Sequence, residues 1–261
     1  MFCTDDKHPS DLLEKGHIDY IAREAINKYG VDPIIAVKAA CHHASRYFLL
    51  NNRGAIAPGY LADFAVIDNF KDFNVEMVFK KGVLYWNNGE LRDFDAPQIE
   101  EYLDKRAHDT FHVATLTPDD FRDTRQRGVL GMVPGEIITT DNGYADHVDL
   151  EKDILKIAVV ERHKGTHHIG LGYIQGYGLR SGAVATSISH DSHNIIVVGT
   201  NSADMAFAAN YIVEHHGGIV VVENGVVKGS VVLEIAGIMS DRPLTEVNDQ
   251  LEAAKAAAFE L

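Results

Sequence analysis

The chain has 261 residues and a formal net charge of −14, and its 46% hydrophobic and 24% charged residues are ordinary for a globular protein. This length is enough for one large domain or for two to three small ones. The acidic charge repels phosphate backbones and the chain has no basic run, so we expect neither nucleic acid nor a membrane surface as a partner. No apolar run reaches the roughly 18 residues of a membrane span, and the first residues do not resemble a signal peptide. Cys3 and Cys41 form no CxxC pair, which favours a reducing cytoplasm.

Two acidic residues follow a short apolar segment at the beginning of the sequence. Residues 2–4 predict the end of a buried strand, and the carboxylates of Asp5 and Asp6 then emerge at its C-terminal edge. Because a strand needs neighbouring strands, we expect the rest of that sheet to come from other polypeptide.

Helices are predicted between this segment and residue 48. Ser10 is a candidate cap for a short helix that Gly16 stops. Apolar residues at helical spacing predict a second helix over 18–29, and Pro33, which suits a first turn, opens a third that runs to about residue 47. The apolar face predicted for this third helix consists of Ile34, Ile35, Val37, Ala40 and Cys41.

Short β segments separated by glycine turns are predicted from 49 to 91. Residues 64–67 are typical of a buried strand, and residues 75–79 and 83–86 predict a hairpin. Residues 93–106 form a polar connector, partly helical, which we interpret as a domain boundary.

The remainder is predicted to be α+β. Residues 203–215 predict an amphipathic helix with Ser202 as its cap, closed by Gly217 and Gly218, and a last helix opens at 241–245. The strand candidates are 111–116, 129–133, 136–140, 154–160, 170–173, 183–189, 195–198, 218–222 and 226–233.

Four stretches resemble one protein family. The segment TDDKHPSDLLEKGHID at 4–19 resembles the end of the catalytic barrel in adenine deaminases of the amidohydrolase superfamily. Residues 54–82, with the motif PGYLADFAVID, resemble the small β domain that follows the barrel in many amidohydrolases. Residues 161–201, with HDSHNIIVVG, and IAGIMSDRPL at 235–244 look like the C-terminal domain of adenine deaminases.

This resemblance implies an α+β fold in three parts. Residues 1–48 are the expected end of a (β/α)8 barrel, 49–93 a small segment of β-sandwich type, and 94–261 an α+β C-terminal domain. The implied activity is that of a hydrolase in adenine catabolism and purine salvage, which converts adenine and water into hypoxanthine and ammonia. Because full family members carry a long N-terminal part with most of the barrel, we expect a C-terminal portion that is inactive alone and pairs with a missing N-terminal barrel chain.

The chemistry implied by the resemblance needs a metal and a carboxylate. A bound metal activates water at neutral pH, and a carboxylate moves a proton toward the departing ammonia. By resemblance, Asp5 is the aspartate that ends the last barrel strand, as metal ligand and proton shuttle, and Asp6 is its substrate-side neighbour. The family implies a binuclear site with manganese or iron, but this sequence has no HxH pair, so its ligand set is incomplete. The alternative from the residues alone is a surface turn at Asp5 and Asp6.

The cluster HDSHN lies between two predicted strands. Its substrate-side candidates are His190, Asp191, His193 and Asn194. One reading places the histidines against the purine, where they bond it or carry protons. The equally weighted alternative is a loop stabilised by its own Asp and Asn capping bonds. A third hypothesis is an independent metal hydrolase that uses His190, Asp191 and His193.

Other charged residues have structural interpretations. Glu161 and Arg162 follow a predicted strand and predict an internal ion pair. His17 and Asp19 either orient the segment with Asp5 or form a helix cap with a satisfied histidine, and we favour the cap.

Two further expectations concern partners. A lone barrel segment would expose apolar residues such as Ile34, Val37 and Cys41, which predicts a homo-oligomer or a partner subunit. The alternative to an enzyme part is a non-catalytic purine-binding or interaction remnant of the family.

Overall fold

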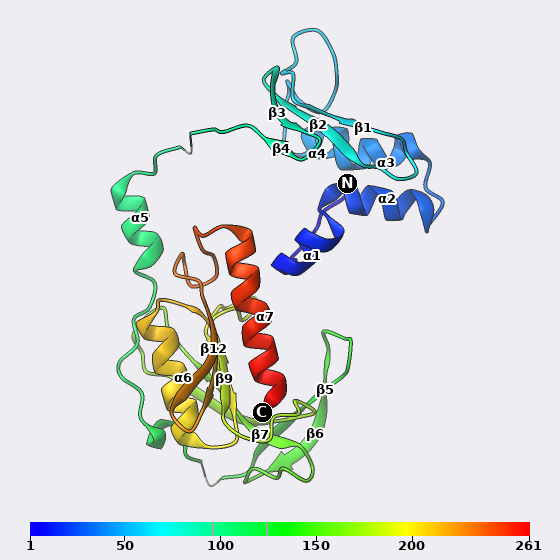
Figure 1. Ribbon diagram of the computed structural model, residues 1–261. Helices are drawn as coiled ribbons and strands as arrows, with labels where there is room; N and C mark the ends of the chain where they lie inside the picture. The colour runs from blue at the N-terminus through cyan, green and yellow to red at the C-terminus, as the bar shows by residue number, and fades with distance from the viewer. Residues whose placement is uncertain (96, 124) are drawn as a thin grey trace. The chain divides into compact units, whose positions relative to one another are not determined.

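The structure is a computed structural model that describes residues 1–95, 97–123 and 125–261 (Figure 1). The chain divides into two compact units, Met1–Gln98 and Ile99–Leu261. Each unit contains one β-sheet together with helices, so the fold is mixed α and β as expected. Across the described residues, no helix is both long and apolar enough to cross a membrane.

Four helices open the first unit: α1 (Pro9–Lys15), α2 (Ile18–Asn27), α3 (Pro33–Ala40) and α4 (His42–Tyr47). Helix α1 begins at Pro9 rather than after a Ser10 cap, because the fixed φ of proline suits a first helical position. Gly16 ends α1 with φ 96°, as predicted. The Asp32 side chain accepts hydrogen bonds from the first amides of α3. The predicted helix over 33–47 is interrupted at Cys41.

One prediction for this unit is wrong, and the exposure of Ile34 on α3 is as expected. Residues 2–4 form no strand, and the described strands of the unit pair only with one another. Helix α3 buries Ala36 and Ala39 against α2, whereas Ile34 and Ile35 are 51% and 57% exposed. Small side chains allow the two helices to approach closely, so the alanines form the contact face and the isoleucines point outward.

The β segment of the first unit is a four-stranded antiparallel meander. Its strands are β1 (Phe64–Ile67), β2 (Val75–Lys80), β3 (Val83–Asn87) and β4 (Glu90–Leu91), paired in chain order. Lys81 and Gly82 link β2 to β3 with φ of 50° and 78°, the positive values of a tight hairpin turn. The predicted strand and hairpin are therefore confirmed.

The second unit carries an eight-stranded sheet in the order β12-β11-β9-β10-β7-β8-β5-β6, in which only the β5–β8 pair is parallel among the described residues. Its elements are α5 (Glu101–His108), η1 (Pro118–Phe121), β5 (Arg127–Met132), β6 (Thr139–Ala145), β7 (Ile154–Val160), β8 (Ile169–Gln175), β9 (Ala183–Thr186), β10 (Ile195–Gly199), α6 (Ser202–Glu214), β11 (Gly218–Glu223), β12 (Val226–Val232) and α7 (Leu244–Glu260).

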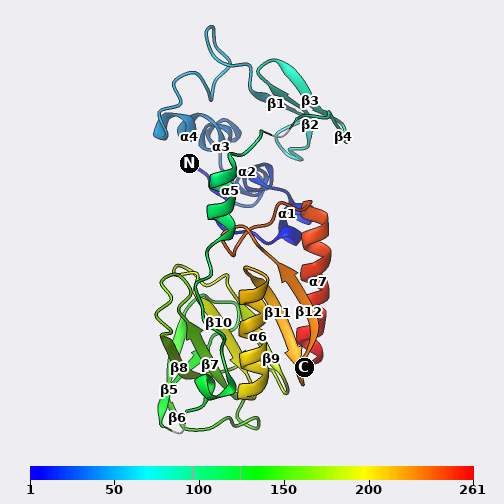
Figure 2. The same ribbon diagram turned by 90° about the vertical axis from the view of Figure 1, so that its left-hand side faces the viewer.

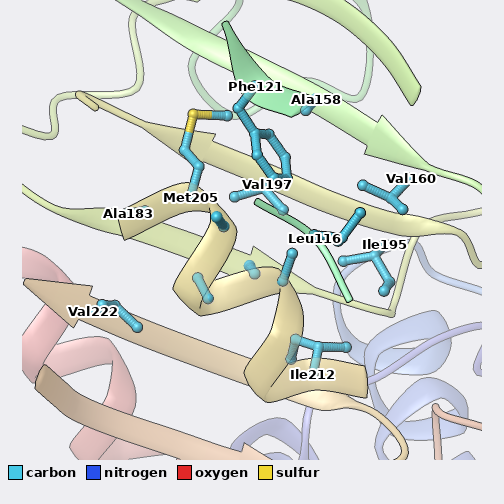
Figure 3. Packing of buried hydrophobic residues seen from close by; sticks show 14 of the residues in the cluster. Leu116, Phe121, Ala158, Val160, Ala183, Ile195, Val197, Met205, Ile212 and Val222 are labelled. Atoms are coloured by element: carbon cyan, nitrogen blue, oxygen red, sulfur yellow. The ribbon is translucent and has the colours of Figure 1, made fainter. Parts of the chain in front are cut away.

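Helices α6 and α7 cover opposite faces of this sheet (Figure 2). On β11, Val220 and Val222 join the core beneath α6, whereas Ile219 packs in the cluster with Leu251 of α7. Successive side chains of a strand point to opposite faces, so the alternation places one helix on each side. The larger core lies under α6, where Phe121, Met205 and Val197 meet (Figure 3).

Most elements predicted for the second unit are present, with shifts at their ends. Strand β7 is as predicted, and β6 begins at Thr139 rather than at 136. Helix α6 begins at Ser202, but its cap is Asn201, whose side chain accepts the amide hydrogen of Asp204. Residues 111–116 form no strand: the amide of His112 donates to the carbonyl of Arg162, and the backbone of Leu116 bonds the side chain of Asn210 on α6 instead of a neighbouring strand.

Candidate functional site

Asp5 lies on an exposed turn of the first unit. Its φ is 54°, in the left-handed region, and its carboxylate accepts the amide hydrogen of Asp6 at 2.9 Å. The hydroxyl of Thr4 lies 3.4 Å from Nε2 of His17, so the turn that opens α2 contacts the segment with Asp5. This geometry fits both readings of Asp5: a surface turn by itself, and a carboxylate free to face other ligands.

The contact of His17 with Thr4 depends on the conformation of the turn at 16–19. The carboxylate of Asp19, the second residue of α2, accepts the amide hydrogen of His17 at 2.8 Å, and His17 rather than Asp19 is the N-cap residue of that helix. A Cβ on Gly16 would lie 2.6 Å from Oδ2 of Asp19, which explains why glycine stands there. The predicted cap at Asp19 is therefore wrong by two positions, while His17 contacts Thr4 next to Asp5.

The described residues do not form a metal site. Among residues 1–95, 97–123 and 125–261, no three or more His, Cys, Asp or Glu side chains gather as a group that could hold a metal ion. A catalytic metal needs at least three protein ligands, so Asp5 alone does not fit one. His190, Asp191 and His193 form no such group either, and the hypothesis of an independent metal hydrolase has no ligand cluster behind it.

The HDSHN cluster forms the connection between the antiparallel strands β9 and β10. His190 and Asp191 are exposed and joined by a cis peptide bond, whereas His193 and Asn194 are half-buried. The rings of His190 and His193 meet edge to face, with centroids 5.0 Å apart. Nδ1 of His193 is buried without a hydrogen-bond partner within the part of the chain that the structure describes.

The end of β7 anchors this loop through three hydrogen bonds. Nε of Arg162 donates to the carbonyl of His193, and the amide of Arg162 donates to Oδ1 of Asn194 at 3.3 Å. Nε2 of His163 lies 2.8 Å from the carbonyl of Ser192. Asn194 thus ties the loop to the segment after β7, and of the two histidines His190 is exposed whereas His193 is half-buried.

Arg162 is buried without the predicted ion pair. Its side chain is 2% exposed, and its Nη1 donates to the carbonyl and hydroxyl of Thr110 at 2.9 and 3.1 Å. Nη2 donates to the carbonyl of Ala236 at 2.9 Å, and the guanidinium lies 4.3 Å from the ring centre of Phe111. Burial lowers the pKa of Arg162. The predicted Glu161–Arg162 pair is wrong, because the guanidinium bonds oxygens of Thr110, His193 and Ala236 and the Glu161 carboxylate bonds the turn that follows it.

Glu161 instead organises the turn that follows β7. Its carboxylate accepts the amide hydrogens of His163 and Lys164 at 2.6 and 2.9 Å, and the hydroxyl hydrogen of Thr166 at 2.8 Å. Desolvation acts to raise the pKa of Glu161, but the hydrogen bonds from Thr166 and the backbone amides outweigh it and lower that pKa to about 2. The carboxylate is therefore a fixed anion at neutral pH.

Sequence reasoning missed that the segment 235–239 lies beside the HDSHN loop. Arg162 contacts both, and the hydroxyl of Ser187 also donates to the carbonyl of Gly237. Both segments belong to the stretches quoted above for their family resemblance, which was the one signal that could have connected them.

Comparisons with known proteins cover the whole chain. Residues 1–85 match the sequence model of the Amidohydrolase family, and residues 135–261 match that of the Adenine deaminase C-terminal domain. A curated adenine deaminase of Kosmotoga olearia is 40% identical over 278 aligned positions, which cover 100% of this chain and 46% of the relative. Adenine deaminases of Nitratidesulfovibrio vulgaris and Petrotoga mobilis are 40% and 41% identical, over 100% and 97% of this chain and 46% and 45% of each relative.

The chain thus spans about half the length of the curated relatives that it matches. The match includes both units: the amidohydrolase segment falls in the first, and the C-terminal domain falls in the second. The resemblance inferred from the motifs is therefore confirmed, and this chain is similar along its entire length to adenine deaminases of the amidohydrolase family.

Proposed function

We propose that this chain is part of an adenine deaminase, which hydrolyses adenine to hypoxanthine and ammonia. The observation that carries the proposal is the similarity of about 40% to curated adenine deaminases over the whole chain. In this reaction water adds at C6 of the purine, the bond from C6 to the amino nitrogen breaks, and the nitrogen leaves as ammonia after it takes up a proton. The organisation that we propose is a barrel end at 1–48, a small β segment at 49–93 and a C-terminal domain at 94–261.

We assign Asp5 as a metal ligand in this reaction. Amidohydrolases are generally metal-dependent, and manganese or iron is the metal that we propose for the complete protein. When bound, that metal supplies activated water. Asp5 is the one ligand that we assign to this chain, with Asp6 beside the substrate, and the remaining ligands belong to the part of the relatives that this chain does not match.

We assign the HDSHN loop to substrate binding. His190 and His193 present two imidazoles 5.0 Å apart, and each imidazole has one nitrogen that donates and one that accepts when neutral. A purine offers ring nitrogens as acceptors and an amino group as donor, so the pair is chemically matched to adenine. Asp191 is exposed beside them, whereas Asn194 holds the loop through the amide of Arg162.

The test is adenine binding and adenine turnover by the full chain. We expect calorimetry to detect adenine binding, and we expect no hypoxanthine when the chain is incubated alone with manganese or iron. Absence of binding would overturn the proposed function. Turnover by the chain alone would overturn the assignment of the other metal ligands to a different segment. Binding that is equally tight for unrelated heterocycles would favour an interaction remnant.

Two variants sharpen this test. His193→Gln and His190→Gln should each weaken adenine binding by about tenfold, the effect of losing one hydrogen bond to a buried ligand group. His108→Gln is the matched control, because His108 is a half-exposed residue at the end of α5 whose Nδ1 contacts the carbonyl of Asp104. Asp5→Asn should leave adenine binding by this chain unchanged and should abolish activity once the complete ligand set is present.

Cellular context completes the proposal. Cys3 and Cys41 are free thiols, which fits a reducing cytoplasm, and adenine breakdown there would serve purine salvage.

Exposed Ile34 and Ile35 on α3 support association with another subunit, either a second copy or a barrel chain. Sedimentation of the purified chain tests this, since a monomer at every concentration would contradict it.

A further inference from the structure

Three chain segments that are distant in sequence converge on one buried guanidinium. Arg162 donates through Nε to the carbonyl of His193, through Nη1 to Thr110 and through Nη2 to the carbonyl of Ala236. The three acceptors belong to the segment before η1, to the HDSHN loop and to the turn 235–239, which is closed by the bridge between Ile235 and Met239. Every one of these acceptors is an uncharged oxygen.

Stability by itself does not account for a cation at this position. Transfer of a charge into the interior carries a large desolvation penalty, and well-packed apolar residues often replace even paired buried charges without loss of stability. Within the described part of the chain, the oxygens that Arg162 bonds belong to carbonyls and a hydroxyl, and burial lowers its pKa, so no carboxylate offsets that penalty. The guanidinium offers what an apolar side chain lacks, which is a planar fork of donors that reaches several carbonyls at once.

Phe111 and Gly237 pack closely against the guanidinium of Arg162. The ring of Phe111 lies against the guanidinium at 4.3 Å. A Cβ on Gly237 would lie 3.0 Å from Nη2 of Arg162 and 2.9 Å from the Phe111 ring, so the turn 235–239 approaches closely only because residue 237 is glycine. Arg162 therefore bonds the HDSHN loop on one side and this closely packed turn on the other.

We infer that Arg162 is a positioning residue, which holds the HDSHN loop and the turn 235–239 together as a single adenine-binding surface. This inference rests on the proposed function, and it adds the turn 235–239 to the substrate side. Arg162 itself is buried behind the loop and bonds the backbone of His193, so it acts on the substrate through the position of that residue.

The test compares Arg162→Lys and Arg162→Met with Arg180→Met in the full chain. Arg180 is the matched control, because it is exposed and its Nη1 donates to the carbonyl of Leu150, which lies outside the three segments. Amide hydrogen exchange is measured at 189–194 and 235–239, and adenine affinity is measured by calorimetry well below the melting temperature of each variant.

We expect both Arg162 variants to accelerate exchange at 189–194 and 235–239 by about tenfold or more, while amides of β10 and β11 keep their wild-type rates. Adenine Kd should rise by about tenfold, with no change for Arg180→Met. Lysine keeps the charge but offers a single ammonium in place of the fork, so the lysine variant decides the question if the methionine variant does not fold.

Other outcomes overturn the inference. Wild-type exchange rates at both segments in a folded lysine variant would show that Arg162 does not position them. Faster exchange spread evenly over the second unit, with unchanged adenine Kd below the transition, would show a merely structural role. If the wild-type chain binds no adenine, the proposed function fails, and the exchange rates still decide whether Arg162 holds the two segments together.

Discussion

The side chain of Asn210 takes the place of a strand partner for Leu116. Its Oδ1 accepts the amide hydrogen of Leu116 at 2.9 Å, and its Nδ2 donates to the carbonyl of the same residue at 2.8 Å. Leu116 is 3% exposed, so both of its backbone groups would otherwise lose their hydrogen bonds away from water. One amide on α6 thus holds an extended segment over the core.

Asn210→Leu should therefore destabilise the second unit. We expect its free energy of unfolding to fall by about 2 kcal/mol, because two buried backbone groups are left unsatisfied. Denaturant titration measures this loss. Asn142→Leu is the control, since Asn142 is exposed and bonds the side chains of Thr140 and Gln175, and its loss should stay under about 0.5 kcal/mol. Equal losses would contradict the role given to Asn210.

Phe121 is the aromatic residue at the centre of the larger core. It is 0% exposed beneath α6, and Phe121→Ala should lower the free energy of unfolding by about 3 to 5 kcal/mol through the cavity that it leaves. Phe259→Ala removes the same ring from a residue that is 91% exposed on α7 and should have almost no effect. A loss below about 1 kcal/mol for Phe121→Ala would show that this core is not as closely packed as described.

Gly237 is predicted to tolerate no side chain. Its φ is 76°, and an added Cβ meets Phe111 at 2.9 Å, so Gly237→Ala should cost about 3 kcal/mol from backbone strain and steric overlap together. Gly225→Ala separates the two effects. Gly225 has φ 71° but open space around its Cβ position, so it should cost about 1 kcal/mol. Thermal unfolding of both variants measures the difference, and equal costs would argue against the contact.

The carboxylate of Glu161 predicts a pH dependence of stability in the acid range. Its pKa is about 2 in the folded chain, against an ordinary value of 4.5, so folding favours the ionised form. The stability that it contributes is fully present above pH 4.5 and is lost as the pH falls toward 2.

Glu161→Gln should therefore flatten the curve of unfolding free energy against pH between about 5 and 2. Thr166→Val removes the hydroxyl that bonds Glu161 at 2.8 Å, so it should move the acid transition to higher pH without abolishing it. Chemical denaturation at each pH measures both. A wild-type slope in the Glu161→Gln variant would show that another carboxylate carries the acid dependence.

Local patterns were sufficient for elements whose stabilising contacts are close in sequence. The apolar run of β7 and the two-residue turn Lys81–Gly82 identified a strand and a hairpin, because strand propensity and turn geometry act over a few residues. Element ends were less well predicted. Helix α1 begins at Pro9 rather than at Ser10, since several residues near a helix end compete to start it.

The same local patterns could not predict contacts between residues that are distant in sequence. Residues 111–116 have the composition of a strand, yet the backbone of Leu116 bonds a side chain 94 positions away in sequence, and the amide of His112 donates to the carbonyl of Arg162. On α3 the small residues Ala36 and Ala39 are buried, in a helix that packs on α2 and α4, whereas the larger apolar residues Ile34 and Ile35 are exposed. Neither outcome follows from periodicity, because each depends on which neighbour the fold supplies.

The amino-acid sequence by itself determined the family resemblance, the mixed α and β composition, most of the strands of the second unit and the candidate residues Asp5, His190 and His193. Tertiary structure alone decided that Arg162 pairs with carbonyls rather than with Glu161, and that the turn 235–239 lies beside the HDSHN loop. The physical reason is that hydrogen bonds of a buried group are satisfied by whatever the fold brings within about 3 Å, and adjacency along the chain does not specify that.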